Sequence, residues 1–252
     1  MPLAISLGLL IPFFGTSLGA ASVFLFHGRS SDRLESLLCG FASGVMIAAS
    51  VWSLIIPAIE MTESDGGIGW IPAAVGLLLG VLFLLSVENL FPALGERREG
   101  RGRSLLFFSV TLHNLPEGMA VGVVYAALLG GADGVSLASA LGLSLGIALQ
   151  NLPEGAVISM PMVGVGASRG RSFSAGVLSG IVEPIGGALM LLLSTYLSPL
   201  LPYLLSFAAG AMLHVVVREL VPVSQANDNG VLGVLGVSFG FLLMMILDVV
   251  FG

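Results

Sequence analysis

Two short polar stretches interrupt a chain that is otherwise mostly apolar. The first reads His-Asn-Leu-Pro-Glu-Gly at residues 113–118, and the second reads Gln-Asn-Leu-Pro-Glu-Gly at residues 150–155. Imidazole nitrogen together with carboxylate and amide oxygen suits zinc, and also iron or manganese. These two stretches, called the first and the second hexapeptide below, therefore make a divalent metal site the chemistry to consider first.

Helical spacing gathers the ligand types of the first hexapeptide on one side of a helix. His113 and Glu117 are four residues apart, and Asn114 and Glu117 are three apart, so Glu117 lies about one turn from each of the other two. Pro116 has no backbone N–H and its ring crowds the preceding turn, which frees the carbonyl of Leu112 and predicts a kink. Ligands on one face beside a freed carbonyl fit a polar cavity better than lipid.

The second hexapeptide repeats this arrangement with Gln150, Asn151, Pro153 and Glu154, and a later apolar segment adds Glu183. An ionised carboxylate at the bilayer centre costs several kcal/mol unless it is compensated. The sequence places no lysine or arginine at that depth. The compensating partner is therefore protons or a bound cation, and the absence of thiolates argues against copper(I).

The composition is that of a membrane protein. Of 252 residues, 56% are hydrophobic and only 10% are charged, whereas soluble domains carry about 25% charged residues. Apolar segments of about 20 residues, the length that crosses the hydrocarbon core, recur throughout, and a β-barrel would show shorter alternating segments instead. We expect one all-α polytopic domain, residues 1–252, with eight transmembrane helices. Their expected positions are 3–26, 34–59, 68–92, 104–130, 135–161, 172–196, 202–223 and 231–251.

The basic residues predict the orientation. All nine are arginine, and eight of them fall in alternate loops, on one side of the expected membrane. Positive loops stay in the cytoplasm, so both termini are expected outside and the fourth and fifth spans are antiparallel. The two hexapeptides would then be related by a pseudo-twofold axis in the membrane plane, as in transporters with a midplane site. The eight are Arg29, Arg33, Arg97, Arg98, Arg101, Arg103, Arg169 and Arg171.

The set of motifs resembles that of the ZIP (Zrt-, Irt-like) metal transporters, and most closely their GufA-like branch. The resemblance runs over nearly the whole chain. It is carried by FASGVMIAASVWSLIIPAIE (41–60), HNLPEGMAVG (113–122), QNLPEGAVISMPM (150–162), VEPIGG (182–187), AAGAMLHVVVREL (208–220) and LLMMILD (242–248). It implies a ZIP-type helix bundle with the kinked fourth and fifth helices at its core.

The resemblance also implies a binuclear metal site in the middle of the transport path. The first metal position would take His113, Glu117, Gln150 and Glu154, with Met46 nearby. The second would take Asn114, Asn151 and Glu183, with Glu117 and Glu154 bridging the two. Ser53 and Asp248 would lie toward the outer entrance, and Arg218 and Glu219 toward the cytoplasmic exit. Many relatives carry histidine at the start of the second hexapeptide, so Gln150 and Asn151 predict a weaker second position.

Several of these residues also have a purely structural interpretation. Met46 lies on an apolar helix, where a thioether more often packs than binds a metal. Ser53 can serve as a packing or backbone-bonding hydroxyl, and Asp248 lies near a span end where an acid can reach the interface. His214 lies in an apolar run and is interpreted as a contact between helices.

The function implied is uptake of a divalent metal across the plasma membrane, with zinc as the first expectation and cadmium, iron and manganese as further substrates. A multi-pass protein of the bacterial inner membrane, working by alternating access, is expected. One alternative is a selective cation channel. A less favoured one is an intramembrane metalloenzyme, because no H-E-x-x-H pairing is present. We expect no enzymatic activity, no organic cofactor and no nucleic acid partner; the lipid bilayer and a second copy of the chain are the expected partners.

Overall fold

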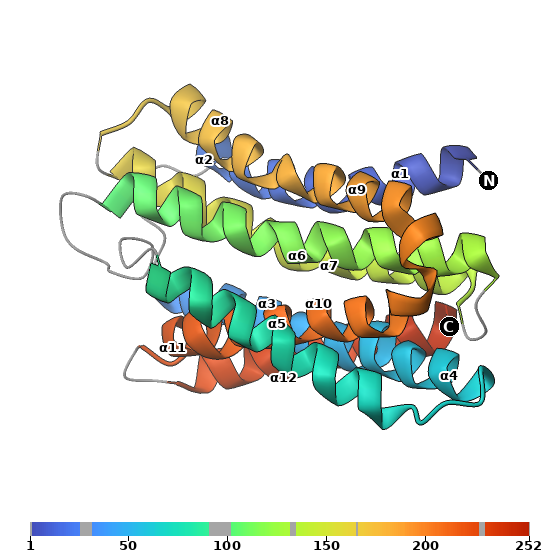
Figure 1. The fold of residues 1–252 in the computed structure, drawn as a ribbon. Coiled ribbons are helices and arrows are strands. Elements are labelled where there is room, and N and C mark those ends of the chain that lie inside the picture. Colours follow the sequence, from blue (N-terminus) through green and yellow to red (C-terminus); the bar gives the residue numbers. More distant parts are fainter. Residues whose placement is uncertain are drawn as a thin grey trace.

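The fold is an all-helical bundle, shown as a computed structural model in Figure 1. It describes residues 2–25, 32–90, 102–131, 135–164, 166–226 and 230–251, and no strand occurs among them. The elements are α1 (Pro2–Ala20), α2 (Ser22–Leu25), α3 (Asp32–Ala49), the π-helix η1 (Ser50–Ile55), α4 (Ile56–Ser64), α5 (Trp70–Leu90), α6 (Gly102–Gly130), α7 (Leu137–Gly164), α8 (Arg169–Gly180), α9 (Val182–Leu197), the 3₁₀ turn η3 (Ser198–Leu200), α10 (Leu201–Val215), the π-helix η4 (Val216–Leu220), α11 (Val221–Ser224) and α12 (Val231–Phe251).

Seven helical stretches in the described part are long and apolar enough to cross a membrane. They agree with seven of the expected spans and establish a polytopic membrane protein. The remaining expected span, 104–130, corresponds to α6, a helix of 29 residues. Its apolar stretch with described side chains, Glu117–Gly130, is shorter than a span. The eighth crossing therefore remains a prediction.

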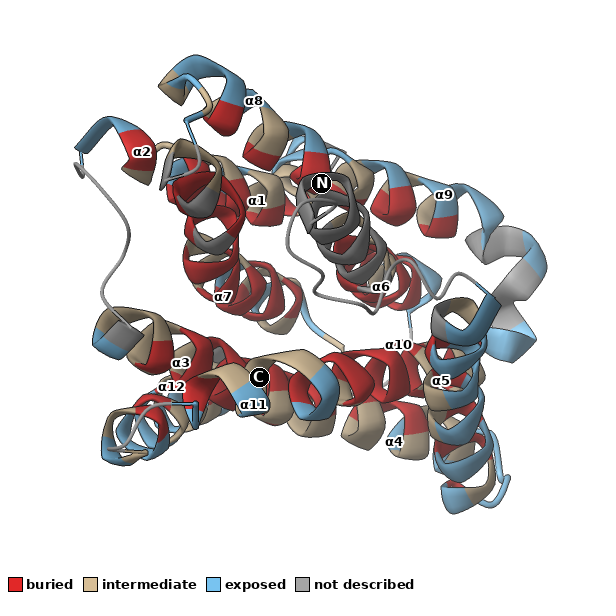
Figure 2. Ribbon diagram, turned by 90° about the vertical axis from the view of Figure 1, so that its left-hand side faces the viewer, coloured by how far each residue is buried: buried red, intermediate tan, exposed pale blue. Residues whose placement is uncertain are grey.

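The helices fall into two groups. The most extensive helix pairings are α1 with α7, α6 with α9, α3 with α12, and α5 with α10. Figures 1 and 2 show α1, α6, α7, α8 and α9 in one layer, called the first bundle, and α3, α4, α5, α10, α11 and α12 in the other, called the second bundle. Buried positions are most frequent in α7, in the α3–α4 helix and in α10–α11, and least frequent in α5 and α12. The inner helices of both bundles therefore meet at the centre of the molecule.

Glycines let the helices within each bundle approach closely. A Cβ added at Gly15 or Gly19 of α1 would overlap the backbone of α7, and one at Gly118 or Gly122 of α6 would overlap the backbone of α9. Small residues four apart are the usual device for close helix packing in membranes. The second bundle uses it in both of its main pairs. The glycines concerned there are Gly40, Gly44, Gly236 and Gly240 for α3 with α12, and Gly76, Gly80 and Gly210 for α5 with α10.

Prolines explain where the helices change type. The π-helix η1 lies just before Pro57, and η4 lies just before Pro222. Proline removes one hydrogen bond and crowds the carbonyl four residues earlier, and a wider π turn accommodates this. The expected span 172–196 is divided at Ile181 into α8 and α9. Pro184 cannot donate to the carbonyl of Gly180 there.

The hexapeptide prolines behave differently. Helices α6 and α7 each continue through their hexapeptide without a change of helix type. The residues one turn before Pro153 are Leu149 and Gln150, which are good helix formers, whereas Ser179 and Gly180 precede the break in the α8–α9 helix. The predicted kinks therefore do not interrupt the two central helices, while a proline further along the chain does divide its span.

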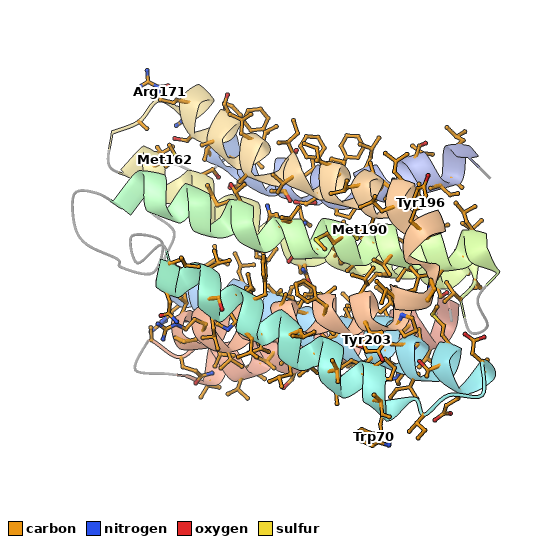
Figure 3. The ribbon with its side chains drawn as sticks, viewed as in Figure 1. Trp70, Met162, Arg171, Met190, Tyr196 and Tyr203 are labelled. Atoms are coloured by element: carbon orange, nitrogen blue, oxygen red, sulfur yellow. The ribbon has the colours of Figure 1, made fainter. Side chains whose placement is uncertain are left out.

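Both termini lie at the same end of the molecule in Figure 1, as an even number of crossings requires. Arg171 lies at the opposite end, and Trp70 and Tyr196 lie toward the end with the termini (Figure 3). Both aromatic side chains are exposed, as expected for residues at a membrane–water interface. Arg29, Arg97, Arg98 and Arg101 lie outside the described residues, so the orientation in the membrane remains a prediction.

Candidate metal-binding site

The polar side chains of the two hexapeptides and of α9 are buried at the centre of the first bundle. Glu117, Gln150 and Asn151 have no exposed surface, and Glu154 and Glu183 are at most 8% exposed. Asn114 is also fully buried. The structure therefore buries these six predicted residues, while their role in metal binding stays a prediction. His113 lies in α6, but its side chain lies outside the described residues, so its part in the cluster is untested.

The last residue of each hexapeptide sets how closely the neighbouring helix approaches. A Cβ at Gly118 would overlap the backbone of Glu183, and a Cβ at Gly155 would overlap the backbone of Thr16. The glycine after each glutamate thus brings α9 or α1 against the hexapeptide helix. The same local sequence that supplies a carboxylate also supplies the contact that encloses it.

Three hydrogen bonds orient the buried groups. The side-chain amide of Gln150 donates to Oε1 of Glu117 at 2.6 Å. Asn114 donates through Nδ2 to the backbone carbonyl of Ser179 at 3.0 Å. The hydroxyl of Thr16 donates to Oε1 of Glu183 at 2.6 Å. Each of these bonds joins two different helices, so the helices of the first bundle are tied together at the polar cluster.

The carboxylates are close enough for their charges to interact. Glu117 lies within electrostatic range of Glu154 and Glu183, and Asn151 lies beside both Glu117 and Glu183. The arginines whose side chains the structure describes are exposed or half-buried, and none is in this cluster. Three acids in a buried region therefore face one another without an arginine between them among the described residues.

Seven buried polar atoms of this cluster have no hydrogen-bond partner in the described part of the chain. A buried polar group left unsatisfied costs about 1–3 kcal/mol, so such a concentration needs an explanation such as an ion. Six of the seven are oxygens, the donor type that divalent cations accept. The atoms are Asn114 Oδ1, Glu117 Oε2, Gln150 Oε1, Asn151 Oδ1 and Nδ2, Glu154 Oε2 and Glu183 Oε2.

The carboxylates do not form a metal site by themselves. Among the described side chains, no three of the types His, Cys, Asp and Glu lie close enough together to hold an ion. Zinc in proteins takes about four ligands at about 2.0–2.2 Å from nitrogen or oxygen. The amide oxygens of the hexapeptides, and His113, are the groups available to complete such a set.

The other predicted residues lie in three places. Met46 is fully buried and packs within the apolar core that both bundles share, which agrees with its structural interpretation. The hydroxyl of Ser53 donates to Oδ1 of Asp248 at 2.5 Å, so these two residues do meet. Glu219, half-buried on η4, lies within electrostatic range of Glu154. Arg218, its neighbour, is exposed.

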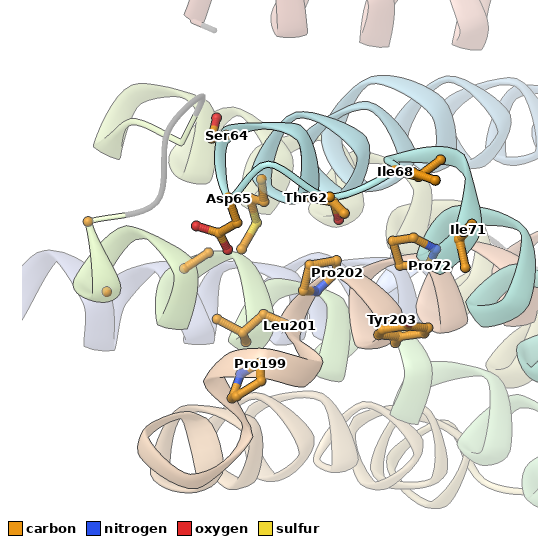
Figure 4. Close-up of a pocket in the computed structure, with 15 residues that line it drawn as sticks. Thr62, Ser64, Asp65, Ile68, Ile71, Pro72, Pro199, Leu201, Pro202 and Tyr203 are labelled. Carbon is orange, nitrogen blue, oxygen red and sulfur yellow. The ribbon is translucent and has the colours of Figure 1, made fainter.

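Two of the cavities at the surface of the described part of the chain have no hexapeptide residue in their lining. One of about 140 Å³ is lined by Ser53, Asp248 and Glu60 of the second bundle and by Val124 and Ser139 of the first. A larger one of about 510 Å³ lies beside the turn between α4 and α5 and the start of α10 (Figure 4). The buried cluster is thus closed to the surface at both of these places.

Sequence reasoning missed Thr16 and the Ser179 carbonyl. Thr16 lies in an apolar helix, and its partner Glu183 is 167 residues away. A threonine in a membrane helix usually bonds a carbonyl of its own helix, so no local signal marks it. The only hint is that Thr16 follows Gly15 in a helix with glycines four apart, the pattern of close helix contact.

Comparison with known proteins identifies the family of the chain. The family model described as "ZIP Zinc transporter" matches residues 98–248. The chain is 36% identical to "Zinc transporter ZIP11" of Xenopus tropicalis, covering 98% of this chain and 96% of that protein. It is 36% identical to "Zinc transporter GufA" of Myxococcus xanthus, with 94% of each covered. It is 35% identical to "Zinc transporter ZIPB" of Bordetella bronchiseptica, with 95% of this chain and 79% of that protein covered. The chain belongs to the ZIP family.

Proposed function

We propose that this protein carries divalent metal ions, zinc first, across the plasma membrane into the cytoplasm. The observation that carries the proposal is the group of unpartnered buried oxygens supplied by α6, α7 and α9. A permanently empty site of this kind would be expensive in a membrane. A cation that binds to these buried oxygens and leaves again explains why they have no hydrogen-bond partner. The names of the relatives support zinc as the ion, and cadmium, iron and manganese are further candidates.

The labile character of the donors fits transport. Carboxylate and amide oxygens with one imidazole bind a metal without the thiolates that hold zinc in closed structural sites. Glu117 and Glu154 are proposed to bridge two metal positions. Asn114, Asn151 and Glu183 belong to the second position, and His113 and Gln150 to the first. Met46 is proposed to lie beside the first position rather than to act as a principal ligand.

Alternating access between the two bundles is the proposed mechanism. Within each bundle, glycines bring helix backbones into direct contact, as at Gly15 and Gly40. Between the bundles, the described glycines make no such backbone contact; Gly146 of α7 faces the side chain of Met244 in α12. Close backbone packing favours two rigid bodies, and a contact through side chains permits one to shift against the other. The metal ligands described above all lie on the first bundle, so that bundle would carry the ion.

Polar residues on two sides of the buried cluster suggest where the ion enters and where it leaves. Ser53 and Asp248 line a cavity between the bundles, and we place the outer entrance there. Glu219 of the second bundle faces Glu154 of the first, and we place the exit there. The predicted orientation makes this movement uptake. GufA and ZIPB are bacterial proteins, which supports the bacterial inner membrane as the location.

The test is zinc flux into liposomes that contain purified protein and a zinc-sensitive dye. Glu117→Gln keeps the shape of the side chain but removes its charge, and we expect it to lower the initial rate by more than about 100-fold, since even residues behind the ligands matter by 10- to 100-fold. Glu63→Gln is the matched control, because Glu63 is an exposed acid on α4 and its uptake should equal that of the wild type.

Normal uptake by the Glu117→Gln protein would refute the assignment of the site. The same assay across zinc concentrations separates a carrier from the channel alternative. A carrier that moves one ion per cycle saturates and is slow. Flux that rises linearly with concentration would instead favour an open pore. Repeating the assay with cadmium, iron and manganese ranks the substrates.

A further inference from the structure

We propose that Thr16 is a positioning residue that holds Glu183 as a one-oxygen ligand and thereby sets the affinity of the second metal position. The proposal rests on the function proposed above and adds a residue that lies outside both hexapeptides. Thr16 lies on α1 and is fully buried. It acts through Glu183, without contact to the metal.

The hydrogen bond between Thr16 and Glu183 has a defined direction. The Thr16 hydroxyl donates to Oε1 of Glu183 at 2.6 Å, and both residues are buried. A hydroxyl has one proton, so it supplies this single bond, which uses one of the two lone pairs of Oε1 and makes that oxygen the poorer donor to a metal. The other oxygen, Oε2, is buried without a partner among the described residues. Glu183 therefore offers one free oxygen to an ion.

The free oxygen of Glu183 has other free oxygens as neighbours. Asn151 lies beside Glu183, and Oδ1 of Asn151 also has no hydrogen-bond partner in the described part of the chain. Asn114 is oriented in the same way as Glu183, because its Nδ2 donates to the Ser179 carbonyl while its Oδ1 stays free. The three ligands proposed for the second position thus each keep a free oxygen.

Thr16 itself is held tightly by the neighbouring helices. The backbone of Thr16 is against Gly155, and its side chain is against Gly180, where an added Cβ would come within 2.9 Å of the Thr16 Cβ. Thr16 is therefore enclosed by α7, α8 and α9 at once. A β-branched side chain in a helix has few rotamers. The close packing around Thr16 favours the rotamer that makes this hydrogen bond, so Glu183 is held in one orientation.

A carboxylate restricted to one oxygen gives a metal one fewer donor than a bidentate carboxylate. Groups that orient a ligand change metal affinity by about 10- to 100-fold when they are removed. Thr16 is thus expected to affect the second position, where Glu183 is a ligand, and to leave the first position, formed by His113, Glu117, Gln150 and Glu154, almost unchanged.

The experiment measures equilibrium binding of Zn²⁺ to the purified full-length protein in lipid nanodiscs by calorimetry. Thr16→Val keeps the shape and removes the hydroxyl. We expect the dissociation constant of the weaker zinc ion to rise by about tenfold or more, with that of the tighter ion within about twofold of the wild type. Thr16→Ser keeps the hydroxyl and should restore wild-type binding. Thr62→Val is the matched control, because the Thr62 hydroxyl bonds the carbonyl of Ala58 in its own helix.

Infrared difference spectra of the wild type supply a second readout that needs no folded variant at position 16. On adding zinc, the band assigned to Glu183 by its loss in Glu183→Gln should have the wide splitting of a carboxylate bound through one oxygen. A bidentate pattern would overturn the proposal. Equal binding by the wild type and Thr16→Val, equal weakening of both ions, or failure of Thr16→Ser to restore binding would each overturn it too. A wild type that binds no zinc at all would instead refute the proposed function.

Discussion

The two hexapeptides have nearly the same sequence but different surroundings. Asn114 and Asn151 occupy the same place in the two motifs. The amide of Asn114 is tied to the carbonyl of Ser179 on α8, whereas neither amide atom of Asn151 has a partner among the described residues. Glu117 accepts a hydrogen bond from Gln150. Glu154 has no such donor at Oε2 in the described part and lies within electrostatic range of Glu219 in the other bundle.

From this difference we propose that the two halves of the site have different roles. The first hexapeptide is fixed by bonds within its own bundle, so it is suited to holding an ion. The second hexapeptide faces the other bundle and keeps more polar atoms without hydrogen-bond partners. It is therefore suited to accepting and releasing an ion. The identical glycines at the ends of both motifs pack against the two partners of one hydrogen bond, Thr16 and Glu183. The two hexapeptides are therefore linked through the hydrogen bond between Thr16 and Glu183.

The largest effect is expected from the acid of the second hexapeptide. Glu154→Gln removes one of the two carboxylates that we propose to bridge the metal positions. Zinc uptake should fall by more than about 100-fold, as for Glu117→Gln, since a lost ligand exceeds the effect of a lost supporting group. Initial rates in dye-loaded liposomes measure it. A variant that retains a tenth or more of the wild-type rate would show that the two acids are not equivalent bridges.

An intermediate effect should separate the two asparagines. Asn114→Ala and Asn151→Ala each remove one oxygen donor, and each should weaken zinc binding by about tenfold. Only Asn114→Ala also removes a hydrogen bond between helices, so its stability should fall by about 1 kcal/mol more. Thermal unfolding in the absence of metal, beside zinc titration, tests this. Equal melting temperatures for the two variants would contradict the different anchoring of the two motifs.

The smallest effect is expected where the motifs themselves differ. Gln150→His makes the second hexapeptide begin as the first does, and imidazole is a stronger zinc ligand than an amide. Zinc should then bind several-fold more tightly and leave more slowly, so that KM and the maximal rate of uptake both fall. Concentration-dependent flux measures both constants. A lower affinity would mean that Gln150 serves mainly to hold Glu117 and does not bind the metal.

The sequence predicted the fold more completely than the site. The helix limits agree closely, as for the expected span 68–92 and the helix Trp70–Leu90, because apolar length is set by the membrane. The π-helices before Pro57 and Pro222, and the division at Ile181, were not predicted. Proline shows where a hydrogen bond is lost, but whether the helix kinks, widens or breaks depends on the neighbouring helices and on residues such as Gly180.

The buried acids and amides could be identified from the sequence because charge in an apolar segment is rare. Their orientation could not. Gln150 donates to Glu117 across 33 residues, and Thr16 reaches Glu183 from the first helix, and neither pairing has a local signal. The role of His113 stays a prediction because its side chain lies outside the described residues. Contacts between distant helices decide these points, and spacing along the chain does not encode them.

The most direct test of the account is anomalous scattering at the zinc absorption edge from crystals of the protein grown in lipid with zinc. We expect a peak between the two hexapeptides, about 2.0–2.2 Å from carboxylate oxygens of Glu117 and Glu154. A second, weaker peak should lie beside Glu183. Peaks confined to the cavity at Ser53 and Asp248, with none between the hexapeptides, would contradict it.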